Sequence, residues 1–179
     1  MRDQLRPEAA SVVQYLRGKG IRTILLSGDR EEVCRSVGSS LGMDEFISGQ
    51  SPEQKLDKIA SLNAQTPTAM VGDGINDAPA LAKASIGISM SDASHIAMQT
   101  ADVVLVNNGL KNLPTALGLG RHTYITIKQN LFWAFFYNIV AIPFAALGYL
   151  TPAMGALIMA CSDVVLVANS VRLFLKKVD

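Results

Sequence analysis

The chain has few cysteines and histidines and no surplus of charge of either sign. Its 179 residues include two cysteines, Cys34 and Cys161, and two histidines, His95 and His122, and the formal net charge is +1. No Cys-x-x-Cys pair occurs and the histidines lack a partner at metal-ligand spacing, which argues against a disulfide framework and against a metal site built from these residues. Runs of basic residues are also missing, so no nucleic-acid partner is expected.

Charged residues are almost absent from one long stretch near the C-terminus. Between positions 129 and 171 the single charged side chain is that of Asp163, although charged residues make up 17% of the chain and hydrophobic residues 49%. The N-terminus is polar and has no signal-peptide character. Because the apolar excess is confined to one part of the sequence, a single soluble domain is not expected.

Residues 1–120 alternate between helical and strand patterns. The short aliphatic runs at 21–26 and 68–71 are typical of buried parallel strands, and further strands are expected at 86–89 and 103–106. This alternation predicts an α/β domain with a mostly parallel sheet. Ligands of such sheets bind at the carboxyl ends of the strands, so functional residues are expected there.

Residues 121–179 carry two apolar stretches, at about 128–150 and about 152–173. A helix of about 20 apolar residues crosses a bilayer core, so we predict two transmembrane helices and a short cytosolic tail. Lys and Arg flank the pair on the side of the chain ends, and the turn between the stretches has neither. The positive-inside rule then predicts an integral membrane protein with lipid as a partner and both termini in the cytosol. A buried soluble hairpin is the alternative.

A glycine-rich turn with two carboxylates follows one of the expected strands. Asp73 lies between Gly72 and Gly74, and Asp77 follows one helical turn later, directly after Asn76. Carboxylates combined with water and phosphate oxygens are the ligands that Mg²⁺ prefers, so we predict that Asp73 binds Mg²⁺ and that Asp77 is a second or outer carboxylate. Asn76 is expected to hydrogen-bond within the turn. A tight turn that starts a helix is the alternative interpretation.

Two other segments offer partners for a phosphoryl group. Ser27-Gly28-Asp29 ends an expected strand, and it provides a hydroxyl and a glycine backbone that can approach a phosphate closely. Lys55 lies in the first turn of a helix expected after Pro52, where its ammonium can reach a phosphoryl oxygen. Each feature alone has an ordinary structural explanation. Phosphoryl transfer needs a metal, a cation and hydrogen-bond donors around one group, and the set together predicts such a site.

The ordered motifs resemble those of P-type ATPases. They are Asp3-Gln4-Leu5-Arg6-Pro7, Ser27-Gly28-Asp29, Pro52-Glu53-Gln54-Lys55 and Gly72-Asp73-Gly74-Ile75-Asn76-Asp77. The resemblance implies a partial haloacid-dehalogenase-like (Rossmann-like) domain, the C-terminal part of the phosphorylation domain, followed by the last two transmembrane helices. It also implies that Asp73 and Asp77 serve the Mg²⁺ site, that Lys55 steadies the transferred phosphoryl group and that Ser27 hydrogen-bonds it.

Other parts of the family pattern are missing from this sequence. The phosphorylated aspartate of the family stands in Asp-Lys-Thr-Gly-Thr, which does not occur here, and neither does the Thr-Gly-Glu of the actuator domain. We therefore expect a C-terminal piece of a pump that needs its N-terminal part as partner. ATP would be bound mainly by an absent domain, and this piece alone is not expected to hydrolyse it.

Polar residues in the two apolar stretches bear on the transported ion. Tyr137 and Asn138 lie in the first stretch, and Met159, Ser162 and Asp163 lie in the second. Polar groups in a bilayer are costly and therefore functional candidates, and a thioether suits Cu(I). Helix packing is the alternative. The pattern resembles copper-transporting members of the family and implies Cu(I) export, but Asp163 departs from it, so a divalent ion (Zn²⁺, Cd²⁺ or Co²⁺) stays open.

Two functions of other kinds also stay open. A membrane-anchored phosphatase of the haloacid-dehalogenase superfamily would need an Asp-x-Asp motif, which this chain lacks. A non-catalytic module would bind a complete pump or a metal ion without hydrolysing ATP.

Overall fold

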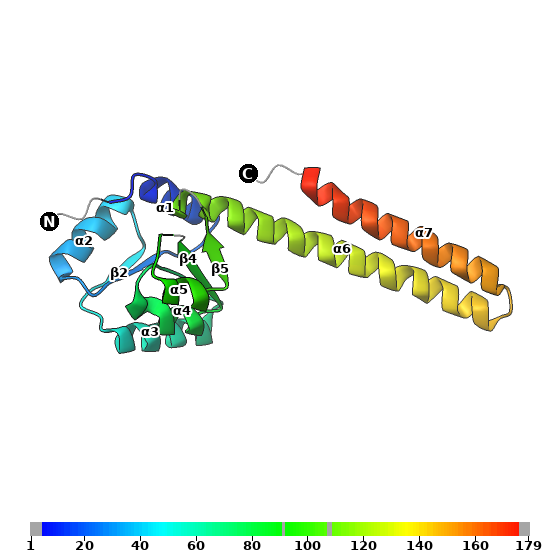
Figure 1. Cartoon of the computed structure of the whole chain (residues 1–179), viewed down its shortest axis with the longest axis horizontal. Coiled ribbons are helices and arrows are strands. Elements are labelled where there is room, and N and C mark those ends of the chain that lie inside the picture. Colours follow the sequence, from blue (N-terminus) through cyan, green and yellow to red (C-terminus); the bar gives the residue numbers. More distant parts are fainter. Residues whose placement is uncertain (1–4, 91, 107–108, 176–179) are drawn as a thin grey trace. The chain divides into compact units, whose positions relative to one another are not determined.

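The structure is a computed structural model that describes residues 5–90, 92–106 and 109–175 (Figure 1). The chain divides into two compact units, Met1–Pro114 and Thr115–Asp179. The first unit is an α/β domain, and the second consists mainly of two long helices. The predicted boundary at residue 120 falls inside the first of these helices.

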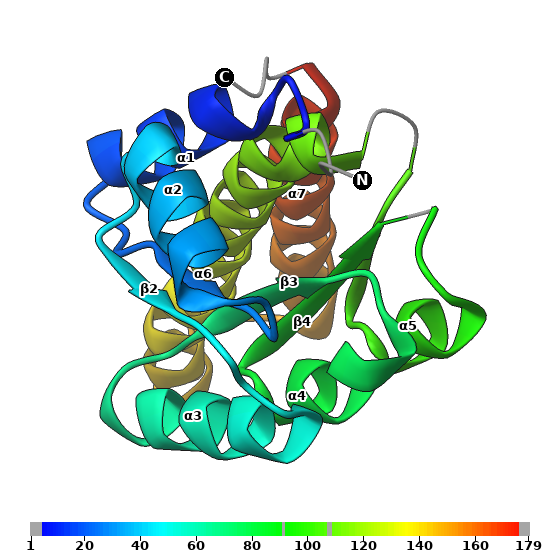
Figure 2. The same ribbon diagram turned by 90° about the vertical axis from the view of Figure 1, so that its left-hand side faces the viewer.

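Short strands and helices alternate through the first unit. The strands are β1 (Ile24–Leu26), β2 (Glu45–Ile47), β3 (Ala69–Gly72), β4 (Ile86–Met90) and β5 (Val103–Leu105). The helices are α1 (Ala9–Gly18), α2 (Glu31–Leu41), α3 (Pro52–Gln65), α4 (Ala78–Lys83) and α5 (His95–Thr100). Figure 2 shows α3, α4 and α5 on one side of the strands and α1 and α2 on the other.

The strands form two separate parallel sheets. One has the order β1-β2 and the other the order β3-β4-β5. The predicted parallel α/β arrangement is confirmed, but the division into two sheets and strand β2 were not predicted. Within the described part of the chain, β1 therefore pairs with β2 alone, and β3 pairs with β4 alone.

Local signals in the sequence account for the ends of the main helices. At the start of α3 the side chain of Ser51 accepts from the backbone N–H of Gln54, and the Gln54 side chain caps the backbone N–H of Ser51 in return. This capping box, with Pro52 at the first helical position, fixes the first turn of α3. At the other end of the preceding helix, Gly42 has a φ of 67° and ends α2 in the left-handed conformation.

The core of the first unit joins α3, α4 and α5 to the β3–β5 sheet. Its buried members are Ile59, Met70, Ala80, Leu81 and Ala97. Leu26 of β1 packs against this cluster, which links the two sheets through side chains. A Cβ at Gly87 would lie 2.6 Å from the carbonyl oxygen of Leu81, so α4 packs directly on the backbone of β4. This close packing holds α4, which follows the glycine-rich turn, against the sheet.

The second unit contains α6 (Leu113–Ala146) and α7 (Pro152–Val171), followed by a short 3₁₀ segment, η3 (Arg172–Leu175). The turn between the helices includes Gly148 at φ 77°, and the Thr151 hydroxyl accepts from the backbone N–H of Met154 at the start of α7. Among the described helices, α7 alone is long and apolar enough by composition to cross a membrane. The predicted apolar helix at about 152–173 is thus present. That α6 also crosses a membrane stays a prediction.

Polar side chains join α6 to α7 within the second unit. Asn169 Nδ2 donates to Asn130 Oδ1 at 2.8 Å, and Asn130 Nδ2 donates to Ser170 Oγ at 2.9 Å. Interhelical hydrogen bonds of this kind hold apolar helices together where water does not compete. The side chain of Asn130 therefore serves helix packing.

Candidate functional site

The contact that defines the candidate site joins α3 to the glycine-rich turn. Lys55 Nζ donates to Asp77 Oδ1 at 2.8 Å, and both side chains are only 15% exposed. Lys55 comes from the first turn of α3, and Asp77 ends η1 (Ile75–Asp77). Two residues predicted to share a site are therefore brought together, in a charge-assisted hydrogen bond that is partly shielded from water.

The glycines of the turn leave room for the side chain of Asp77. A Cβ at Gly72 would lie 3.0 Å from the Cβ of Asp77, and one at Gly74 would lie 3.4 Å from Asp77 Oδ2. A side chain at position 72 would push against Asp77 and disturb its contact with Lys55. Asn76 is exposed, and in the described part of the chain its side chain does not make the predicted hydrogen bond within the turn.

Asp73 differs from Asp77 because its carboxylate is open to solvent. Its side chain is 59% exposed, and Oδ2 lies 4.0 Å from Arg6 Nη2. Its backbone carbonyl accepts from the N–H of Ser94 at 2.9 Å, which ties the end of β3 to the segment after β4. The carboxylate is thus fixed through the backbone while its oxygens stay accessible.

Arg6 has a closer partner in Asp92, which follows β4. Arg6 Nη2 donates to Asp92 Oδ2 at 3.0 Å. This hydrogen bond raises the pKa of Arg6 and lowers the pKa of Asp92. Sequence reasoning did not assign Asp92 to the site. The available signal was its position just beyond a parallel strand neighbouring the one that leads to Asp73.

Ser27 lies at the end of the other sheet. Its hydroxyl donates to Asp29 Oδ2 at 2.9 Å and accepts from the backbone N–H of Asp29 at 3.2 Å. A Cβ at Gly28 would lie 3.3 Å from the carbonyl oxygen of Gln50. Among the described residues, no hydrogen bond or ion pair joins Ser27 to Lys55 or to the glycine-rich turn. The predicted group is therefore assembled only in part by direct contacts.

The carboxylates of the turn fit a magnesium ion with few protein ligands. Among the described residues no group of three or more His, Cys, Asp or Glu side chains is placed to hold a metal ion. Mg²⁺ commonly takes one or two carboxylates and completes its octahedron with water and phosphate oxygens. The exposed carboxylate of Asp73, four residues before Asp77 in the same turn, matches that donor set. A buried structural metal site would need more protein ligands.

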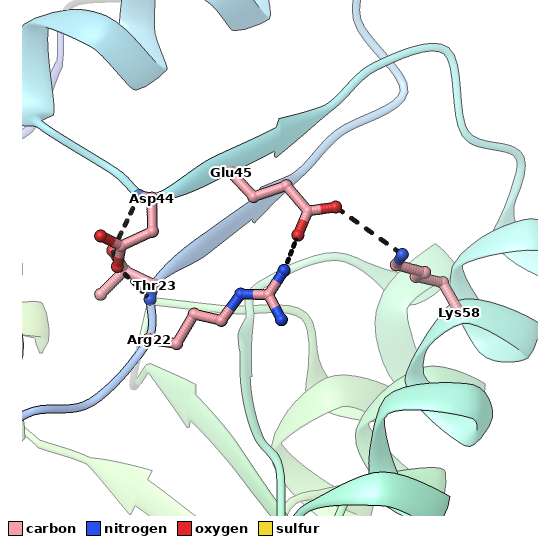
Figure 3. A network of polar contacts seen from close by, with 5 residues as sticks. All are labelled: Arg22, Thr23, Asp44, Glu45 and Lys58. Carbon is pink, nitrogen blue, oxygen red and sulfur yellow. Dashed lines mark hydrogen bonds and ion pairs between the residues drawn. The ribbon is translucent and has the colours of Figure 1, made fainter.

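A second polar network lies at the opposite ends of the strands and has a structural role (Figure 3). Thr23, just before β1, donates from both its N–H and its hydroxyl to Asp44 Oδ2 at 2.8 Å. The backbone N–H of Thr23 is the main cause of a lowered pKa of Asp44. Glu45 at the start of β2 pairs with Arg22 and, at 3.7 Å, with Lys58 of α3. These contacts hold β1, β2 and α3 together.

The five residues predicted to form an ion path do not converge in the second unit. Tyr137 and Ser162 line one apolar groove of about 520 Å³, together with residues such as Trp133, Phe144, Met154 and Cys161. Asn138 Nδ2 instead donates to the carbonyl oxygen of Ala134 in its own helix at 2.7 Å.

The other two predicted ion-path residues lie outside this groove. Asp163 lines a second groove with residues that include Val167 and Arg172. Met159 lines neither groove and is 57% exposed. The structure thus brings Tyr137 and Ser162 together and leaves Asn138, Met159 and Asp163 apart from them.

Comparisons with known proteins agree with this geometry. A family model for haloacid dehalogenase-like hydrolases matches residues 1–85. A copper-exporting P-type ATPase of Staphylococcus haemolyticus is 42% identical over 172 residues, which cover 96% of this chain and 22% of that protein. The solved structure of a zinc-transporting PIB-type ATPase in the E2.Pi state superposes with a TM-score of 0.91 at 36% identity, covering 96% of this chain and 28% of that one. The chain belongs to the P-type ATPase family.

Membership of the P-type ATPase family confirms the resemblance noted in the motifs. It also confirms the haloacid-dehalogenase-like fold with parallel sheets, followed by a helix that could span a membrane. The cation-transporting P-type ATPase B of Mycobacterium tuberculosis is 44% identical and is covered over 23% of its length. The chain thus spans about a quarter of the length of these P-type ATPases. Their names refer to copper, to cations and to zinc, so they do not identify one metal.

Proposed function

We propose that this chain is the C-terminal part of a heavy-metal pump that exports Cu(I) through an aspartyl-phosphate intermediate. It would supply half of the phosphoryl site and the last two transmembrane helices, with both chain ends in the cytosol. The observation that carries this proposal is the 2.8 Å contact between Lys55 and Asp77, because it places a shielded cation beside the turn that holds Asp73. A divalent heavy-metal ion is the alternative cargo.

The residues of the turn and of α3 divide the work at the phosphoryl group. When bound at Asp73, Mg²⁺ would offset negative charge on the phosphoryl oxygens. Asp77 holds the Lys55 ammonium in place through one proton, which leaves two N–H donors for phosphoryl oxygens. The Ser27 hydroxyl would exchange Asp29 for a phosphoryl oxygen, and the backbone at Gly28 would allow a close approach.

The aspartate that receives the phosphoryl group is proposed to come from the N-terminal part of the pump. Ser27 follows β1 and Asp73 follows β3, and in the described chain each of these strands has one edge without a partner strand. A further parallel strand between β1 and β3 would join the two sheets. An aspartate at its carboxyl end would lie among Ser27, Lys55 and Asp73. ATP would be bound mainly by a domain outside this chain.

The choice of Cu(I) rests on the second unit. Met159 offers an exposed thioether, a soft ligand that suits Cu(I). Tyr137 and Ser162 face one groove, which leaves room for ligands from helices outside this chain. Asp163 is a harder ligand, and it is the residue that keeps a divalent ion open.

The test is a chimaera in which this chain replaces the matching C-terminal segment of the Staphylococcus haemolyticus pump. Phosphoenzyme formed from ATP is measured with Cu(I) and with Zn²⁺. Lys55→Ala is expected to lower it by about 100-fold, as loss of one preorganised charge does. Lys58→Ala, on the same helix but paired with Glu45, is the matched control and should leave it unchanged. Equal effects of the two substitutions would contradict the phosphoryl site.

The cargo is tested in the same chimaera. Met159→Ala should weaken Cu(I)-stimulated phosphorylation without affecting phosphorylation by inorganic phosphate, which needs only the phosphoryl site. Stimulation by Zn²⁺ and not by Cu(I) would assign the pump to divalent ions.

A further inference from the structure

Arg6 lies between two carboxylates and has no role in the phosphoryl site described above. Its Nη2 atom donates to Asp92 Oδ2 at 3.0 Å and lies 4.0 Å from Asp73 Oδ2. Arg6 precedes α1, whereas Asp73 and Asp92 follow the neighbouring strands β3 and β4. The fold therefore places the Arg6 guanidinium near Asp73, the predicted magnesium ligand, and beside Asp92, a second carboxylate that competes for it.

The surroundings of the guanidinium limit where it can go. A Cβ at Gly109, which is buried at φ 47° in η2 (Gly109–Asn112), would lie 3.6 Å from Arg6 Nη1. The backbone hydrogen bond from Ser94 to the carbonyl of Asp73 ties the Asp92 segment to the turn. The Arg6 side chain is still 39% exposed, so it can move the short distance between the two carboxylates.

We propose that Arg6 is a positioning residue. The way its guanidinium is shared between Asp73 and Asp92 sets the affinity of Asp73 for Mg²⁺. A fixed positive charge near a carboxylate opposes the binding of a second cation there. Asp92 draws the guanidinium away from Asp73 and so keeps the metal site available. Without Asp92, Arg6 closes on Asp73 and competes with the metal. The inference rests on the proposed role of Asp73 as a magnesium ligand.

The experiment measures metal binding directly, without turnover. The chimaera described above, in lipid nanodiscs and with inorganic phosphate present, is titrated with Mn²⁺, an octahedral substitute for Mg²⁺, with free Mn²⁺ followed by electron paramagnetic resonance and then displaced by Mg²⁺. Arg6→Gln should tighten binding by about fivefold, the size expected for a charge 4 Å away in a largely solvated setting. Asp92→Asn should weaken it by about threefold, because the released guanidinium then pairs with Asp73.

Opposite signs separate this role from a structural one. If Arg6 and Asp92 only held the fold, both substitutions would weaken binding, and that result would overturn the inference. Arg6→Lys keeps the charge and should stay within about twofold of the parent chimaera. Arg17→Gln removes a similarly exposed arginine that pairs with Asp44 instead, and it should leave binding unchanged. The gain from Arg6→Gln should shrink as salt screens the interaction.

Asp73→Asn distinguishes failure of the inference from failure of the proposed function. If Asp73→Asn removes Mn²⁺ binding and Arg6→Gln does not tighten it, only the role of Arg6 is wrong. If Asp73→Asn leaves binding unchanged, or if the parent chimaera binds no Mn²⁺, the proposed magnesium site itself is wrong.

Discussion

The α/β unit and the helical unit hold their functional candidates in different ways. In the α/β unit, each predicted ligand has a neighbour that fixes it: Asp77 binds Lys55, and the backbone of Asp73 binds Ser94. In the helical unit, the interhelical hydrogen bonds centre on Asn130, whereas Met159 is exposed and lines neither groove. The comparison indicates that contacts among the described residues fix Asp73 and Asp77, whereas they do not bring the five proposed ion-path residues together.

The largest expected effect is a loss of stability when a glycine is replaced, and it should differ between the two units. Gly87→Ala places a Cβ 2.6 Å from the Leu81 carbonyl oxygen, so β4 and α4 must separate. We expect a loss of about 3 kcal/mol in the stability of the α/β unit, the upper range for overpacking a core. Gly155→Ala in α7 is the control, because a Cβ there meets nothing within 4 Å. Chemical unfolding followed by circular dichroism measures both, and equal losses would refute the close packing of α4 on β4.

A smaller effect is expected from two asparagines of α6. Asn130→Ala removes both hydrogen bonds to α7 and should weaken helix association by about 1 kcal/mol. Asn138→Ala removes a hydrogen bond to the carbonyl of Ala134 in its own helix and should change association little. Helix separation in nanodiscs, followed by fluorescence transfer between labels on α6 and α7, reports the difference. A larger loss for Asn138→Ala would show that the polar link lies elsewhere in the pair.

The smallest expected effect concerns acid. The hydrogen bond from the Thr23 backbone lowers the folded-state pKa of Asp44 below its unfolded value. The ionised Asp44 carboxylate therefore contributes fully to stability when the pH is above its unfolded-state pKa. This contribution is lost as the pH falls through the folded-state pKa. Asp44→Asn should lower the unfolding midpoint of the α/β unit at neutral pH and make its fall at acidic pH shallower. Unfolding midpoints between neutral pH and strong acid measure this, and parallel curves for parent and variant would contradict it.

Sequence reasoning predicted those parts of the fold that depend on local patterns. The position of Pro52 predicted the start of α3, and the aliphatic runs predicted four of the strands. The need of phosphoryl transfer for a cation beside carboxylates predicted that Lys55 and Asp77 share a site. Strand β2 was missed because it has only three residues and begins with Glu45, and its pairing with β1 is a tertiary contact.

The sequence could not predict which of several similar side chains or strands would be in contact in the folded chain. Arg6 could pair with any nearby carboxylate, and only the folded chain places it 3.0 Å from Asp92 and 4.0 Å from Asp73. In the same way, the sequence placed Met159 and Asp163 in one apolar stretch but could not show which residues of α7 line the groove shared with α6. Which strands pair is also decided in three dimensions, and the division into two sheets followed from no local signal.

Among the residues that the structure describes, β1 and β3 each have one edge without a partner strand, and this has a consequence for handling the protein. Each edge offers a row of backbone N–H and C=O groups that any extended segment can bind, including a strand of a second copy. We therefore expect preparations of this chain to self-associate through these strands, and a short extended peptide that binds along them should keep the chain monomeric.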